Sequence, residues 1–108
     1  MRIPKRLNIM GYVFRVKYAK NLPFSGSFDT MNRVIMLDEA HPNLSEVLLH
    51  EVTEVVMCMM HLNKDYGINR KTMMPTRRKF VLHHYGDRDD FTTFCTTLYD
   101  TLRRNKLI

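Results

Sequence analysis

Three polar residues whose types suit metal chemistry interrupt an apolar stretch of the sequence, at His50, Glu51 and Glu54. His50 and Glu54 are four residues apart, so on a helix their side chains lie one turn apart and can reach a common point. An imidazole nitrogen and a carboxylate oxygen both bind zinc in proteins. The His-Glu-x-x-Glu pattern therefore indicates a metal-binding helix, although the polar face of an ordinary amphipathic helix would explain His50 and Glu54 equally well.

Glu51 favours a functional site over that plainer interpretation. At about 100° of rotation per residue, Glu51 lies on the apolar side of the helix, among Val47, Val55 and Cys58. A buried charge without a partner costs several kcal/mol, so a carboxylate in such a place usually has a partner or a task. Next to a metal cation and partly desolvated, Glu51 would act as the general base on a metal-bound water.

A catalytic zinc ion normally has three protein ligands, so a further ligand must come from elsewhere in the chain. The candidates lie just before or at the start of a second predicted helix: His83, His84, Asp87, Asp89 and Asp90. Histidine is the better ligand type, which favours His84, and Asp89 is the acid that the packing of that helix would place best. The acids would equally serve as an N-cap and as compensation for the helix dipole, and the histidines as an exposed pair.

The first helix is predicted by apolar residues that recur with helical spacing from about Asn43 or Ser45 to residues 62–63. Ser45 is a plausible N-cap, but Asn43 with Glu46 has the better spacing for a capping box.

The second helix is predicted after Gly86, with Asp87 as its N-cap. Its apolar stripe comprises Phe91, Phe94, Cys95, Leu98, Tyr99 and Leu102. Because Cys58 and Cys95 both lie in apolar helical patterns, we expect both to be buried free thiols.

Strands are predicted before the first helix. Alternation within residues 7–19 predicts one strand, and residues 20–29 contain the glycine, proline and serines typical of a turn region. A second strand covers Val34–Leu37, after a tight turn at Asn32 and Arg33.

The segment 63–87 is predicted to be a long, basic and mostly irregular connection, with a short strand possible within 78–85. The order of elements predicts an α+β fold in a single domain over residues 1–108. In this fold, N-terminal antiparallel strands are followed by a metal-site helix and a C-terminal helix.

The bulk composition fits one folded domain, with 108 residues of which 44% are hydrophobic. The net charge of +6 would favour anionic partners such as nucleic acid, but the basic residues form scattered short groups typical of a solvated surface. No apolar run approaches the roughly 20 residues of a membrane span, and no signal-peptide pattern opens the chain. We therefore expect a cytoplasmic protein that does not interact with membranes.

Three segments resemble small phage and bacterial zincin-like metallopeptidase domains. They are the strand segments GYVFRVKY and SGSFDTMNRVIMLDEA, the helix LSEVLLHEVTEVV, and DFTTFCTTLYDTLRRNKL with Leu98, Tyr99, Leu102 and Asn105 in the family's pattern. The likeness covers residues 8–106. It implies one zinc ion bound by His50 and Glu54, with Glu51 as the base, and a peptide substrate added along Val34–Leu37 as an edge strand.

The family's third ligand aligns with Arg88 or Asp89 of this chain. Arginine does not bind zinc, so the third ligand stays open between Asp89 and a displaced His84. The resemblance implies a zinc-dependent metallopeptidase of phage or prophage origin, acting in the cytoplasm of the host cell. The alternative is a catalytically degenerate protein of the same fold that binds nucleic acid or a host protein through the basic segment Arg70–Lys79.

Overall fold

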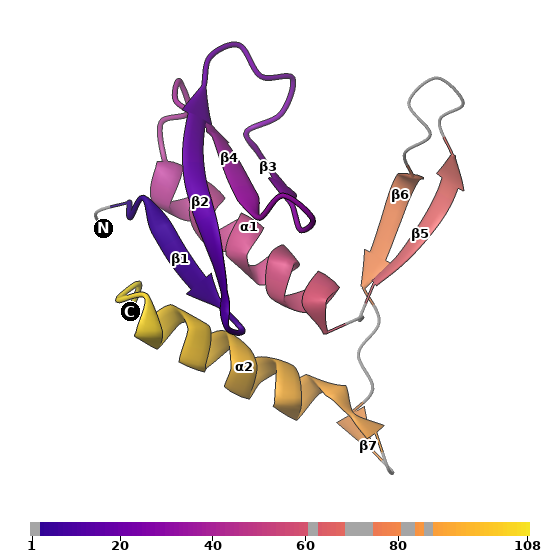
Figure 1. Ribbon diagram of the computed structural model, residues 1–108. Helices are drawn as coiled ribbons and strands as arrows, with labels where there is room; N and C mark the ends of the chain where they lie inside the picture. The colour runs from indigo at the N-terminus through magenta and orange to yellow at the C-terminus, as the bar shows by residue number, and fades with distance from the viewer. Residues whose placement is uncertain (1–2, 61–62, 69–74, 81–83, 86–87) are drawn as a thin grey trace.

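The structure, a computed structural model, describes residues 3–60, 63–68, 75–80, 84–85 and 88–108, with side chains described for 3–60 and 92–108 (Figure 1). Its first half is one four-stranded sheet followed by a helix, and a second helix ends the chain. The predicted α+β class is therefore confirmed.

The sheet is mixed, whereas antiparallel strands were predicted. Its strands are β1 (Arg6–Ile9), β2 (Tyr12–Ala19), β3 (Gly26–Asp29) and β4 (Val34–Asp38), in the spatial order β1-β2-β4-β3. β2 is antiparallel to β1 but parallel to β4, and β4 is antiparallel to β3. The chain thus passes from β2 to the far edge of the sheet before it returns as β4 in the middle.

The segment 7–19, predicted as one strand, is a hairpin of β1 and β2. Met10 and Gly11 both have positive φ, 53° and 88°, as a two-residue type I′ turn requires. The Asn8 side chain accepts a hydrogen bond from the Gly11 backbone N–H at 3.0 Å and closes the turn. Glycine at position 11 is the local signal for this turn.

β3 lies within the segment predicted as a turn region, so that prediction is wrong for Gly26–Asp29. Its short and weakly β-forming sequence is held by pairing with β4, in which Phe28 is opposite Ile35. The turn predicted at Asn32 and Arg33 is confirmed. The Asp29 carboxylate accepts hydrogen bonds there from the Asn32 backbone N–H, from the Asn32 side-chain amide and from the Met31 backbone N–H. These bonds, with those from Asn32 first, lower the pKa of Asp29.

Helix α1 (Leu44–Met59) begins after the predicted N-cap, Asn43, whose Oδ1 accepts from the Glu46 backbone N–H at 3.2 Å. The second half of the capping box differs: the Glu46 carboxylate accepts from Asn43 Nδ2 at 3.2 Å, and not from the Asn43 backbone N–H, which donates to His41. The helix ends before the predicted 62–63, since a strand begins at Asn63.

The connection predicted as irregular contains paired strands. β5 (Asn63–Ile68) is antiparallel to β6 (Pro75–Phe80), and this hairpin projects away from the sheet (Figure 1). β7 (His84–Tyr85) and β8 (Arg88–Asp89) form a second, shorter pair. Helix α2 (Asp90–Arg104) begins directly after β8, so Asp89 precedes the helix and Asp90 is its first residue.

The core lies between one face of the sheet and α1. Its largest fully buried side chains are Phe14, Leu7, Ile9, Ile35, Leu37, Leu48, Val52, Val55 and Val56. α1 packs on β3 and β4, and α2 runs beside β1 and α1 (Figure 1). Since α2 lies at the margin of the core, only a narrow face of it is buried. Cys95 and Tyr99 are therefore exposed, against the predicted stripe, while Thr101 is buried.

Cys58 is half-buried, so neither cysteine is the fully buried thiol that the sequence predicted. Within the described part of the chain, neither helix has the length and apolar character that a membrane crossing demands.

Candidate metal centre

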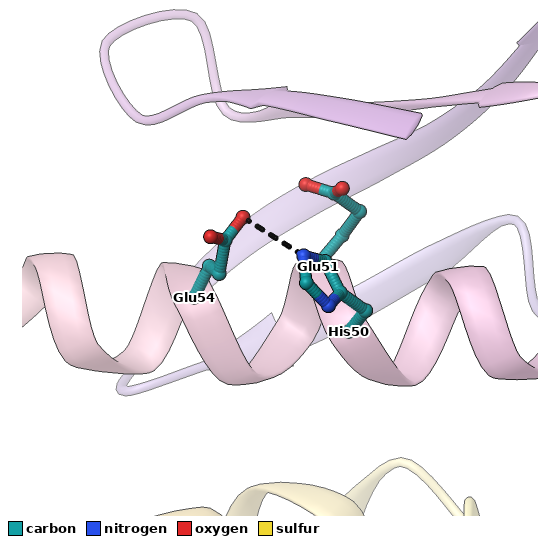
Figure 2. A group of neighbouring side chains, drawn as sticks. All are labelled: His50, Glu51 and Glu54. Carbon is teal, nitrogen blue, oxygen red and sulfur yellow. Dashed lines mark ion pairs between the residues drawn. The ribbon is translucent and has the colours of Figure 1, made fainter. Parts of the chain in front are cut away.

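The middle of α1 brings together His50, Glu51 and Glu54. One ligand atom from each side chain lies within 4.8 Å of one from each of the other two, and among the described residues these three form the only such cluster of metal-ligating types. His50 Nε2 is 3.5 Å from Glu54 Oε2, one helical turn away (Figure 2). The convergence predicted from the four-residue spacing is therefore present.

The three side chains differ in their exposure to solvent. The His50 side chain is 67% exposed and that of Glu54 is 28% exposed, whereas Glu51 as a residue is only 4% exposed. Glu51 extends from the helix toward the sheet, with its carboxylate near the other two side chains (Figure 2). The prediction that Glu51 lies on the apolar side of the helix is confirmed. The site therefore has two metal-ligating side chains, His50 and Glu54, at its exposed rim and the Glu51 carboxylate in its buried part.

Gly26 of β3 passes close over Glu51. A Cβ atom at position 26 would lie 2.7 Å from Val47 Cγ1, 3.0 Å from Glu51 Cγ and 3.1 Å from Glu51 Oε1. Only glycine allows this approach without displacement of those atoms. From the sequence, Gly26 was assigned only to a turn region. Its role could not be predicted, because the need for glycine arises from Val47 and Glu51 of α1.

A pocket of about 400 Å³ opens beside the cluster. Besides the three site residues, it is lined by Phe24, Ser25, Gly26, His41, Glu46 and Val47. The walls thus come from β3 with the residues before it, from the first half of α1 and from the loop before α1. Sequence reasoning did not assign His41 to the site, and only the structure places it at this pocket.

The spacing of His50 and Glu54 suits a tetrahedral metal ion. Two donors that each bind zinc at about 2.0–2.1 Å with tetrahedral angles are about 3.4 Å apart. The observed separation of His50 Nε2 and Glu54 Oε2 is 3.5 Å. The donor set and its spacing therefore fit a divalent cation at this position.

The described atoms do not place either candidate for the third ligand, His84 or Asp89, beside His50 and Glu54. His84 in β7 and Asp89 in β8 are paired directly with each other through their backbones. Their side chains, like that of Asp90, lie outside the part that the structure describes, and so do His83 and Asp87 as whole residues. The choice between His84 and Asp89 stays as the sequence left it.

The strand Val34–Leu37 was predicted to be an edge strand, and this is wrong. It forms most of β4, which lies between β2 and β3 and has both of its edges occupied. Among the described strands, the edge on the side of the site belongs to β3, the strand that the sequence did not predict. β3 also borders the pocket through Gly26.

Comparison with known proteins adds no family to these observations: no family model matches the chain, and neither a curated protein nor a solved structure is significantly similar to it.

Proposed function

We propose that this chain is a metal-dependent hydrolase of peptide bonds, with a zinc ion held by His50 and Glu54. The observation that carries the proposal is the burial of Glu51, 4% exposed, directly beside a histidine–glutamate pair spaced at 3.5 Å. A polar helix face accounts for the rim residues alone. A catalytic site accounts for all three, including the carboxylate on the core side.

Each residue then has a distinct task. His50 and Glu54, at the rim, bind the ion through Nε2 and a carboxylate oxygen. Glu51 accepts a proton from the attacking water, and the close approach of Gly26 to its stem limits where the side chain can lie. The ion would polarise the substrate carbonyl and make the water more acidic. His84 and Asp89 are the candidates for the third ligand.

The substrate would be an extended peptide that adds to the open edge of β3. Strand addition supplies main-chain hydrogen bonds along an edge, and β3 is the described edge that adjoins the pocket. A peptide paired with Gly26 would lie along the strand residue that contacts Glu51 and would border the same pocket. In this proposal β3, and not β4 as predicted, is the edge strand that pairs with the substrate.

The test is a zinc titration of the purified protein followed through equilibrium dialysis. We expect one zinc ion per chain, and we expect His50→Ala and Glu54→Gln each to weaken binding by more than the roughly 10–100-fold typical of lost outer-sphere partners. Glu51→Gln should retain zinc and lose hydrolysis of a fluorogenic peptide. Glu46→Gln is the matched control, since Glu46 is on the same helix and lines the same pocket.

The second candidate function is a binding module for nucleic acid. Arg6 and Arg15 are directly opposite each other on β1 and β2, with Lys17 two residues further, and all three are exposed. Like charges in that arrangement destabilise a sheet and attract phosphates. The segment Arg70–Lys79, to which this function was first assigned, lies outside the described side chains. If the purified protein binds no zinc but binds DNA with an affinity that falls steeply as salt rises, this second function replaces the first.

A further inference from the structure

The loop between β4 and α1 holds His41 at the wall of the pocket. The His41 backbone N–H donates to the Asp38 carbonyl at 3.0 Å, and the Asp38 carboxylate accepts from the Ala40 N–H at 3.1 Å. Pro42 follows and disfavours a helical backbone at His41, so the ring stays outside α1. His41 is half-buried in this position.

The hydrogen bond of one ring nitrogen fixes the proton on the other. His41 Nδ1 accepts from the Asn43 backbone N–H at 3.0 Å. A neutral imidazole has one donor and one acceptor nitrogen, so the ring proton of His41 is on Nε2. The bond involves the N-cap residue of α1 and is therefore part of the structure that starts the helix.

This tautomer separates His41 from the metal ligands. A metal-bound histidine nitrogen must offer a lone pair, and in His41 the Nδ1 lone pair is occupied by Asn43 while Nε2 carries the proton. His41 is thus a hydrogen-bond donor at the pocket. In agreement, the cluster of possible ligands contains His50, Glu51 and Glu54 but not His41.

Side-chain hydrogen-bond donors are few in the described lining of the pocket. Three of its residues, Glu46, Glu51 and Glu54, carry carboxylates, which accept hydrogen bonds. Once His50 binds a metal ion, the side-chain donors of the described lining are the Ser25 hydroxyl and His41 Nε2–H. A carbonyl oxygen that gains negative charge during hydrolysis is stabilised by fixed donors of this kind.

We propose that His41 donates a hydrogen bond from Nε2 to the carbonyl oxygen of an acyl substrate held in the pocket. This assignment rests on the proposed hydrolytic function and names a residue that orients its substrate. The proton stays on His41, and no bond is formed or broken there. Asn43 acts through His41, because its N–H keeps the donor on the correct nitrogen.

The first test is the tautomer itself, measured through long-range ¹⁵N–¹H correlation of the ring nitrogens, with His41 assigned from the His41→Gln variant. We expect the Nε2–H form without zinc and the same form after zinc is added, while the His50 nitrogens shift. A proton on Nδ1, or a zinc-dependent shift of the His41 nitrogens comparable to that of His50, would overturn the assignment.

The second test uses a phosphonamidate dipeptide, whose tetrahedral phosphoryl group imitates a hydrated peptide carbonyl. We expect His41→Phe to weaken binding of this probe to the zinc-loaded protein by about tenfold or more, the usual effect of a hydrogen bond to a charged group. His41→Gln can accept from Asn43 and still donate an N–H, so it should retain more of the affinity. Zinc affinity should be the same in wild type and both variants.

The outcomes separate the two proposals. If the wild type binds no zinc, the proposed function fails and this inference fails with it. If zinc binds and the probe binds wild type and His41→Phe equally, only the role of His41 is overturned. If the zinc-loaded wild type does not bind the probe at all, both proposals are contradicted. Thermal unfolding of each variant excludes a loss of fold as the cause, since His41→Phe also removes the acceptor for Asn43.

Discussion

At the residue scale, Glu51 is the side chain on which the interpretation of α1 depends. It shares a helix with His50 and Glu54, but it alone of the three is buried. Burial shields one side of the carboxylate from water. In the proposed hydrolase this carboxylate would act as the base beside His50 and Glu54.

Gly26→Ala tests how tightly the packing of β3 against α1 fixes the Glu51 side chain. The added Cβ would lie 2.7 Å from Val47 Cγ1 and 3.1 Å from Glu51 Oε1, so β3 or the Glu51 side chain must shift. We expect a loss of about 1–3 kcal/mol in the free energy of unfolding, measured through urea denaturation, together with weaker hydrolysis.

Ser27→Ala is the matched control for this change. Ser27 is the next residue of β3 and points to the opposite face of the sheet, away from Glu51. It should leave both stability and hydrolysis nearly unchanged. Equal stability of Gly26→Ala and wild type would contradict the close packing of β3 on α1.

At the element scale, the start of α1 combines two functions in a few residues. Asn43 caps the helix through its side chain, while its backbone N–H holds the His41 ring. The N-cap could be predicted from the sequence, because its pattern involves residues only three positions apart. The bond to His41 could not be predicted, since it requires the loop geometry that the Asp38 carboxylate fixes.

Asn43→Ala should therefore destabilise the protein by about 1 kcal/mol, the usual cost of a lost N-cap. Ser45→Ala is the control, since Ser45 was the competing candidate for the cap and in the structure is the second residue of the helix. Chemical denaturation of both variants decides between the two residues. A larger loss for Ser45→Ala would place the start of α1 further along the chain.

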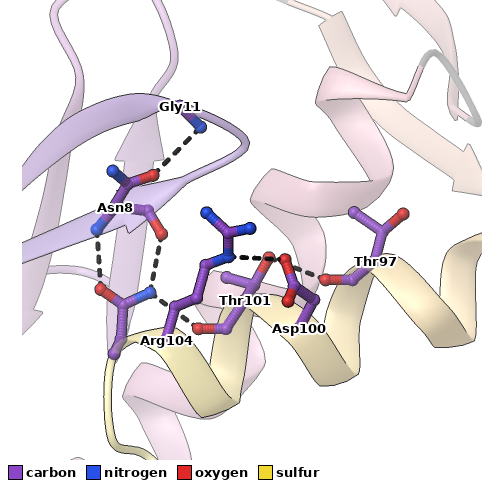
Figure 3. A network of polar contacts seen from close by, with 7 residues as sticks. Asn8, Gly11, Thr97, Asp100, Thr101 and Arg104 are labelled. Carbon is purple, nitrogen blue, oxygen red and sulfur yellow. Dashed lines mark hydrogen bonds and ion pairs between the residues drawn. The ribbon is translucent and has the colours of Figure 1, made fainter.

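At the scale of the whole molecule, the two ends of the chain are joined through Asn105. Its side-chain amide accepts from the Asn8 N–H and donates to the Asn8 carbonyl, both at 2.7 Å (Figure 3). The amide therefore pairs with β1 as a neighbouring strand would. Within the described chain, the β1 edge is thus occupied at Asn8, and β3 keeps the edge that adjoins the pocket.

Asn105→Ala would leave both backbone groups of Asn8 without their partner and release the end of α2. We expect a loss of about 1–3 kcal/mol in the free energy of unfolding. Asn105→Asp keeps the acceptor for the Asn8 N–H but sets a carboxylate oxygen against the Asn8 and Thr101 carbonyls, so it should not restore the stability. The exposed Arg103→Ala should lose little. Urea denaturation with hydrogen exchange at Asn8 measures this; unchanged protection at Asn8 would contradict it.

The sequence by itself determined the features that depend on local spacing. The α+β order, the N-cap at Asn43, the turn at Asn32 and the convergence of His50 with Glu54 all follow from residues a few positions apart. Even the inward direction of Glu51 follows, because helical rotation is fixed at about 100° per residue. These are properties that one helix or one turn has without its neighbours.

Only the tertiary structure decided which elements meet. β3 has no strong strand signal and exists through its pairing with β4, and that pairing makes β3 the edge strand and puts Gly26 over Glu51. Likewise, the exposure of Cys95 depends on how little of α2 the core covers. Periodicity tells which face of an element is apolar; which neighbour covers it depends on contacts between distant residues, and no local pattern encodes those.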